Sequence, residues 1–235
     1  MRGTNFQSYP AYKDSGVEWI GEIPEKWSVK RLKYLLKEMN IRSSTGEERL
    51  LSLSKYLGVV PKSSLEARAG QARTLVGYKV VQPDQLVINK MQAVNGLLAV
   101  SKISGITSPD YSIYKSLETS AINIRYVGYL LSLNQYLAEF KRRVTGVMEG
   151  FIRLYTDDLF DITVQLPSLS EQSSIVDFLG KKCKKIDSAI EQKEEIVELL
   201  KERKQIVTQN AVTKGINPNV KMKGSGVEWS GEIPE

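Results

Sequence analysis

Three charged side chains in the middle of the chain have a spacing that could support chemistry. Pro109-Asp110 precedes Glu139-Phe140-Lys141, a loose match to a Mg²⁺-dependent nuclease in which carboxylates hold the metal and a lysine activates water. Glu139 and Lys141 fall in a segment with helical periodicity, where residues two apart point to different sides. Because a nuclease needs both on one face of a strand, this match is a weak alternative.

A second set of residues could contact nucleic acid. Arginine and lysine pair with phosphates or guanine, whereas asparagine and glutamine pair with adenine. Residues of these types gather in Gly-punctuated segments, although any one of them alone is more often a plain surface group. The candidates for DNA contact are Lys55, Tyr56, Arg73, Lys90, Gln92, Asn95, Lys141, Arg142, Arg143, Thr145 and Arg153.

The residues that the chain lacks exclude several kinds of active site. The sequence has no histidine and a single cysteine, Cys183. This composition excludes histidine-based triads, histidine acid–base catalysis, nearly every catalytic zinc arrangement and a disulfide framework. There is also no nucleotide-binding glycine turn, P-loop or Asn-Pro-Pro-aromatic tetrapeptide. We therefore predict no catalytic residue, no metal and no cofactor.

The net charge of +6 is unevenly distributed along the chain. Residues 26–167 carry twenty basic and twelve acidic side chains, whereas residues 168–212 carry eight of each. A basic surplus confined to one block is the electrostatic footprint expected for a polyanion, most often nucleic acid. A solvated basic face without a ligand would produce the same count.

One motif occurs twice. Residues 15–25 read SGVEWIGEIPE and residues 225–235 read SGVEWSGEIPE, so ten of eleven positions match at an offset of 210 residues. That offset is too long for a solenoid and indicates duplication of a unit the size of a domain. The chain contains one such unit and the opening of the next.

Residues 168–212 have the pattern of one long amphipathic helix. Ser168 and Glu171 form a capping box at its start, and Gly215 and Pro218 mark its end. Positions alternately four and three apart are mostly apolar, which is typical of a coiled-coil seam. The seam consists of Leu179, Cys183, Ile186, Ile190, Lys193, Val197, Leu200, Lys204 and Val207. A helix this long needs a partner helix to cover that seam.

The block before the helix is expected to mix short strands and helices. β-branched and aromatic residues between turn residues predict strands at 50–53, 78–81, 86–89, 97–100, 111–114 and 161–166. Apolar residues at helical spacing predict helices at 29–38 and 127–143. We predict an α+β globular domain at 1–167, a coiled-coil arm at 168–212, and a linker with the start of a second repeat at 213–235.

The chain has no apolar run long enough to span a membrane and no apolar stretch at its N-terminus typical of a signal peptide. We therefore expect a soluble, cytoplasmic protein without a membrane partner.

Six segments together resemble the specificity subunit of type I restriction-modification systems. They read SGVEWIGEIPEKW, INKMQAVNG, GITSPDYSIYK, TGVMEGFIRLY, LPSLSEQSSIVDFLGKKCKKIDSAI and GVEWSGEIPE, and the resemblance covers essentially the whole chain. It implies a non-catalytic reader of double-stranded DNA, with a target recognition domain followed by a long helix. It also implies methyltransferase subunits as partners, and a restriction subunit through the assembled complex.

The chain differs from a full subunit of this family in size. A full subunit holds two recognition domains and two long helices, so the resemblance implies a half-length form, natural or truncated. Two copies could restore the missing half by pairing their helices antiparallel, and the target would then be an inverted repeat. Two alternatives stay open: a Mg²⁺-dependent nuclease using Asp110, Glu139 and Lys141, and a coiled-coil interaction protein that binds no specific DNA.

Overall fold

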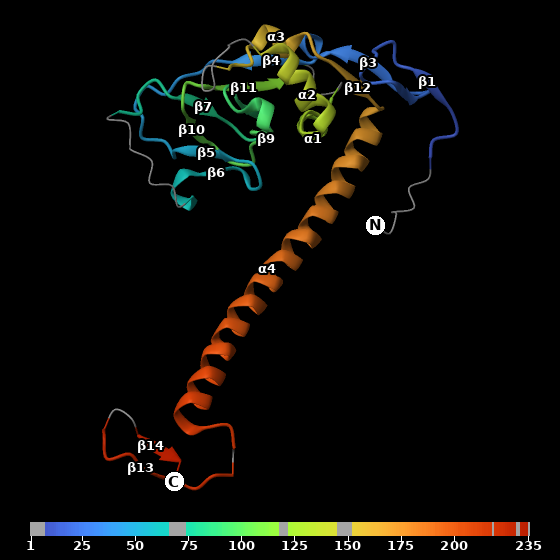
Figure 1. Ribbon diagram of the computed structural model, residues 1–235. Helices are drawn as coiled ribbons and strands as arrows, with labels where there is room; N and C mark the ends of the chain where they lie inside the picture. Colours follow the sequence, from blue (N-terminus) through green and yellow to red (C-terminus); the bar gives the residue numbers. More distant parts are fainter. Residues whose placement is uncertain are drawn as a thin grey trace. The chain divides into compact units, whose positions relative to one another are not determined.

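An antiparallel sheet lies in the first part of the chain, with the strand order β4 (Leu36–Met39), β11 (Tyr111–Ser116), β8 (Leu86–Asn89) and β9 (Leu98–Val100). The computed structural model describes residues 8–65, 74–117, 122–144, 152–217, 219–228 and 231–234. They form two compact units, Met1–Asp177 and Phe178–Glu235. The sheet belongs to the first unit (Figure 1).

Four antiparallel strand pairs complete the β-structure of the first unit. They are β1 (Tyr12–Asp14) with β2 (Glu22–Pro24), β3 (Ser28–Arg31) with β12 (Thr163–Leu166), β5 (Leu51–Ser54) with β6 (Gly58–Pro61), and β7 (Lys79–Val81) with β10 (Gly105–Thr107). Isolated bridges join Arg42 to Lys79 and Leu50 to Ile106. The first bridge joins the segment after β4 to β7, and the second joins the residue before β5 to β10.

Three helices cover the sheet and close the main core of the first unit. They are α1 (Ile124–Leu131), α2 (Asn134–Arg143) and α3 (Thr156–Phe160). α1 packs on β8 and β9, and the side chain of Asn123 caps it by accepting from the Arg125 N–H at 3.0 Å. Val127, Phe140 and Ile162 are fully buried in this core.

Helix α4 (Leu169–Lys214) is a single helix of 46 residues, about 69 Å long at 1.5 Å per residue. Its start is capped as predicted, because the Glu171 N–H donates to Ser168 Oγ at 3.3 Å. Buried Gln172 accepts from the Asn123 N–H at 2.8 Å and donates to the Pro167 carbonyl at 3.0 Å, which fixes the first turn to the first unit. Gly215 ends the helix with a φ of +73°, a value that favours glycine.

The duplicated motif folds into two hairpins of the same register. β13 (Met222–Gly224) pairs with β14 (Glu232–Pro234), and each pair of residues is offset by 210 from its counterpart in β1 and β2. The Ser15 hydroxyl donates to the Val17 carbonyl at 3.1 Å, and Ser225 repeats this bond with Val227 at 3.0 Å. The motif therefore determines its own local fold.

The predicted strands agree with the structure to within two residues, one predicted helix was wrong, and the other is divided in two. Residues 29–38 form β3, a 3₁₀ turn and β4, because pairing with β12 and β11 outweighs the helical spacing of their apolar residues. Residues 127–143 form two helices, since the Ser132 hydroxyl bonds to the Tyr129 carbonyl where α1 ends. Sequence patterns did not predict β1, β2, β6, β10, β13, β14 or α3. No helix in the described ranges is long and apolar enough to cross a membrane.

Candidate nucleic-acid interface

The turn at residues 89–96, between β8 and β9, carries three of the predicted DNA-contacting residues. The Asn89 side chain accepts from the Met91 N–H at 3.0 Å and the Gln92 N–H at 3.2 Å, which holds the start of the turn. Ala93 is fully buried, and Gly96 closes the turn with a φ of +81°. We call this segment the 89–96 turn. These contacts define the backbone from which the side chains of the turn project.

Gln92 and Asn95 lie together on the exposed side of the 89–96 turn. The Asn95 amide donates to Gln92 Oε1 at 2.7 Å. A methyl group at Gly96 would lie 3.9 Å from Cε of Lys55 and 3.5 Å from a methyl carbon of Leu137 in α2. The tip of the β5–β6 hairpin, which holds Lys55 and Tyr56, therefore lies against this turn, as does α2.

A second group of candidates converges on Asp110, in the turn before β11. The Lys90 N–H donates to the Asp110 carbonyl at 3.4 Å, and the Leu154 N–H donates to the Lys90 carbonyl at 3.0 Å. The guanidinium of Arg153 lies 3.7 Å from the Asp110 carboxylate, and its side chain is 41% exposed. The fold thus brings Lys90 and Arg153 together although they lie far apart in the sequence.

Lys141, Arg142 and Arg143 occupy the last turn of α2, and Lys141 and Arg142 are exposed. Arg142 and Arg143 reach back to the buried carboxylate of Glu139, at 3.1 and 2.8 Å. These cations also lie at the helix C-terminus, where they interact favourably with the helix dipole.

The three residues of the nuclease alternative do not share one face of a strand. Glu139 and Lys141 lie on helix α2, and both oxygens of Glu139 are bound by arginines of that helix. Asp110 lies in a separate ion pair with Arg153. Within the ranges that the structure describes, no three histidine, cysteine, aspartate or glutamate side chains are grouped so that they could hold a metal ion.

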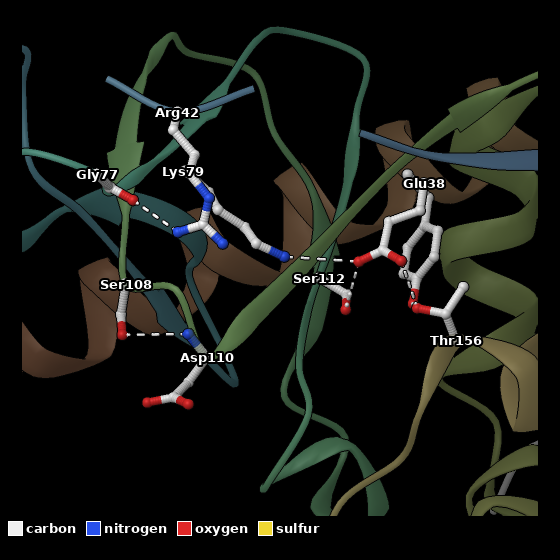
Figure 2. Close-up of polar contacts among 9 residues, drawn as sticks. Glu38, Arg42, Gly77, Lys79, Ser108, Asp110, Ser112 and Thr156 are labelled. Atoms are coloured by element: carbon white, nitrogen blue, oxygen red, sulfur yellow. Dashed lines mark hydrogen bonds and ion pairs between the residues drawn. The ribbon is translucent and has the colours of Figure 1, made fainter. Parts of the chain in front are cut away.

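Glu38 on β4 is the centre of a polar network that sequence reasoning missed. Its Oε1 accepts from the Ser112 hydroxyl at 3.2 Å and lies 3.5 Å from the Lys79 ammonium. Its Oε2 accepts from the Thr156 hydroxyl at 2.7 Å. Figure 2 shows Lys79, Ser112 and Thr156 converging on this carboxylate from three different elements. The side chain of Glu38 is 30% exposed and that of Lys79 only 5%. We call this set the Glu38 network.

Tyr114 completes the Glu38 network. Burial raises the pKa of its phenol to about 12, so the hydroxyl stays protonated at neutral pH. The Thr156 hydroxyl lies 3.0 Å from the Tyr114 hydroxyl, and its own hydrogen is directed at Glu38. Tyr114 therefore donates to Thr156, which donates to Glu38.

Lys79 has an unusual electrostatic environment. Burial lowers its pKa, the nearby charges of Lys90 and Arg42 lower it further, and Glu38 opposes this by favouring the ammonium form. One signal in the sequence could have revealed this residue. Lys79 and Val81 lie on the same strand face, because side chains alternate along a strand. A lysine on a face where apolar residues are expected needs a charged partner.

The predicted seam residues lie along α4, and most of them are exposed. Leu179 is half-buried, and Cys183, Lys193 and Lys204 are exposed. The apolar members from position 186 onward are 48% to 59% exposed, and they are Ile186, Ile190, Val197, Leu200 and Val207. Ile196, Leu199 and Ile206 form a neighbouring exposed stripe. Two candidates for DNA contact, Arg73 and Thr145, lie outside the described residues.

Three solved structures are similar to this chain. A chain from a study of complex assembly and conformational transition of the type I R-M system aligns with 85% of this chain, with 18% identity and a TM-score of 0.57. The HsdS subunit from Thermoanaerobacter tengcongensis aligns with 87% at 16% identity and a TM-score of 0.48. The S subunit of a type I restriction-modification system from M. genitalium aligns with 78% at 11% identity and a TM-score of 0.45.

The first of these similarities establishes the fold. The chain is an α+β protein in which one long helix follows a strand-rich unit, as the sequence analysis predicted. The chain thus shares its fold with a chain from a type I R-M system, in agreement with the resemblance found in the sequence. The chain spans about half the length of the three structures, 48%, 48% and 45%. No protein-family model and no curated protein sequence matches it.

Proposed function

We propose that this chain is the DNA-recognition component of a type I restriction-modification complex, and that its first unit reads one half of a bipartite target. One observation carries the proposal. Residues singled out from the sequence as DNA contacts gather at the 89–96 turn, where Lys55 and Arg153 join it from distant segments. This convergence occurs in the block of the chain that holds the basic surplus.

The site divides into groups suited to bases and groups suited to phosphates. Gln92 and Asn95 present exposed amides, which can pair with adenine, and Lys90 and Arg153 can pair with guanine. The Asp110 carboxylate lies 3.7 Å from the Arg153 guanidinium and offers it a partly exposed counter-charge. Lys141 and the arginines after it suit phosphate contacts, which supply affinity without sequence preference.

Helix α4 supports a role in assembly. Its seam leaves large apolar side chains exposed, and a second copy of the helix, packed antiparallel, would cover them. Full overlap of two such helices would place Ile186 of one copy beside Val197 of the other, and Cys183 beside Leu200. The two first units would then be related by a two-fold axis and would read an inverted repeat with a spacer.

In this proposal the chemistry belongs to partner subunits. Methyltransferase subunits would supply methylation, a restriction subunit would join through the assembled complex, and this chain would choose the sequence. We expect the purified chain neither to methylate nor to cut DNA. Methylation should appear when a methyltransferase subunit and S-adenosylmethionine are added, and it should occur at the sequence that this chain selects.

The same experiment separates the proposal from the nuclease alternative. Asp110→Ala and Glu139→Ala should change methylation only through folding or DNA affinity. Mg²⁺-dependent cleavage by the isolated chain, lost in Glu139→Ala while DNA binding is retained, would overturn the proposal.

A further inference from the structure

The Glu38 network ends at the segment that carries Arg153. Thr156, which donates to Glu38, is the first residue of α3 and lies three positions after Arg153. Between them, Leu154 is 2% exposed, and its N–H bonds to the Lys90 carbonyl. The backbone that carries Arg153 is therefore held between two points, one on the 89–96 turn and one on Glu38.

The network also holds the buried charge of Lys79. Lys79, Lys90 and Arg42 are close enough for their charges to repel, and the Glu38 carboxylate lies 3.5 Å from the Lys79 ammonium. Without that carboxylate the buried ammonium would have no counter-charge. Glu38 is thus tied to Lys79 by charge and to Arg153 by the chain that Thr156 anchors.

Stability alone gives little reason for such a network. A buried ion pair is expensive to desolvate, and an apolar pair of similar volume is often as stable or more so. What the network provides is geometry, because directional bonds fix Thr156 relative to β4 and β11. Base readout needs that geometry, since bidentate pairing of arginine with guanine depends on the position and plane of the guanidinium.

We propose that Glu38, acting through Thr156, is a positioning residue that sets base readout by Arg153 without contacting DNA. This inference rests on the proposed function, because it assigns a role within the same recognition surface. It differs from a purely structural role in one respect. Weakening the network changes which sequence is preferred, and it leaves the affinity for arbitrary DNA unchanged.

The test removes the hydroxyl that joins Thr156 to Glu38. In Thr156→Val, we expect affinity for the selected sequence to fall about tenfold, while affinity for unrelated DNA and its salt dependence stay at wild-type values. The base preference should weaken at the same positions that Arg153→Ala affects. Thr156→Ser, which keeps the hydroxyl, should retain wild-type preference. Thr163→Val on β12, a half-buried threonine outside the network, is the matched control.

A double-mutant cycle makes the test specific. If Thr156 acts through Arg153, then Thr156→Val combined with Arg153→Ala should lose no more specificity than Arg153→Ala alone. Additive losses would overturn the inference, as would a Thr156→Val variant that melts at a lower temperature yet selects the wild-type sequence with wild-type affinity. A wild-type chain without any sequence preference would instead overturn the proposed function, and the inference with it.

Discussion

The two units of this protein use similar apolar residues in opposite ways. In the first unit, leucine, isoleucine and valine side chains such as Leu32, Val127 and Ile162 are buried by the chain itself. Along α4, residues of the same types are about half exposed, as in Ile186 and Leu200. The first unit therefore completes its own core, whereas the seam of α4 still lacks the surface that would cover it.

The duplicated hairpins give the same comparison at the scale of one motif. Ile23 in β2 is 2% exposed and Trp19 packs edge-on against buried Tyr136 at 5.0 Å, so the first unit covers this hairpin. Ile233, the counterpart in β14, is only half-buried. The two hairpins share their register and nearly all of their sequence, so the difference between them lies in what covers each one.

The largest expected effect comes from placing a charge in the seam. Ile186→Asp or Leu200→Asp buries a carboxylate against apolar neighbours in each copy of a paired helix, which costs several kcal/mol. We expect dimer affinity to fall on the order of a thousandfold, measured by light scattering across a dilution series. Gln192→Asp, also exposed on α4 but outside the seam, is the control and should leave the dimer intact. A wild-type chain that is monomeric at micromolar concentration would show that the seam does not pair with itself.

A cross-link tests the direction of pairing. In the antiparallel arrangement with full overlap, Cys183 of one copy lies beside Leu200 of the other and far from its own counterpart. Leu200→Cys should therefore form disulfide-linked dimers through Cys183 on mild oxidation, whereas the wild-type chain should not. Efficient cross-linking of the wild-type chain through Cys183 would indicate parallel helices instead.

The duplicated hairpin supplies a matched pair of stability variants. Ile23→Ala removes a buried side chain and should lower the free energy of unfolding of the first unit by about 2–5 kcal/mol. Ile233→Ala, at the equivalent position of the second hairpin, should lower the free energy of unfolding of the second unit by less than about 1 kcal/mol. Urea denaturation followed by tryptophan fluorescence measures both. Equal losses would mean that the second hairpin is also covered in solution.

Changes at the 89–96 turn and the Arg153 segment should alter sequence preference. Substitution of Lys90, Gln92, Asn95 or Arg153 by alanine should cost about 1–3 kcal/mol at the base pair that is read, and little elsewhere. Competition binding with single-base variants of the target measures this. If all four variants select the wild-type sequence, the reading surface lies elsewhere on the first unit.

The smallest expected effect is electrostatic. Lys141→Ala and Arg142→Ala should weaken binding to all sequences alike and reduce the salt slope by about one unit per lost phosphate contact. In α2 the Glu139 carboxylate competes with phosphate for Arg142 and is not paired with the exposed ammonium of Lys141. Lys141→Ala should therefore have the larger effect. A change of sequence preference in either variant would move that residue to the base-reading group.

The sequence predicted α4 and six of the strands well, but it missed several other short elements. α4 could be predicted because its seam repeats over many turns and Ser168 and Gly215 mark its ends. β3 and β4 were mistaken for a helix because two short strands around a turn place Val29, Leu32 and Leu36 at helical spacing. Their pairing with β12 and β11 depends on contacts that are distant in sequence.

In the candidate nucleic-acid interface, too, contacts between residues distant in sequence could not be predicted. Lys90 and Arg153 could be chosen by residue type, but their meeting at Asp110 depends on how β8, β11 and α3 are arranged. Glu38 and Lys79 were missed because neither lies in a recognisable motif. Their importance comes from the partners that the fold brings to them.

The central claim is that the first unit chooses a DNA sequence, and selection from a random pool of double-stranded DNA tests it most directly. The full chain, with a methyltransferase subunit present, should enrich one motif, an inverted repeat with a spacer of fixed length. Arg153→Ala should change that motif at a defined position in both halves. Recovery of DNA without any enriched sequence, at an affinity that depends only on salt, would contradict the account.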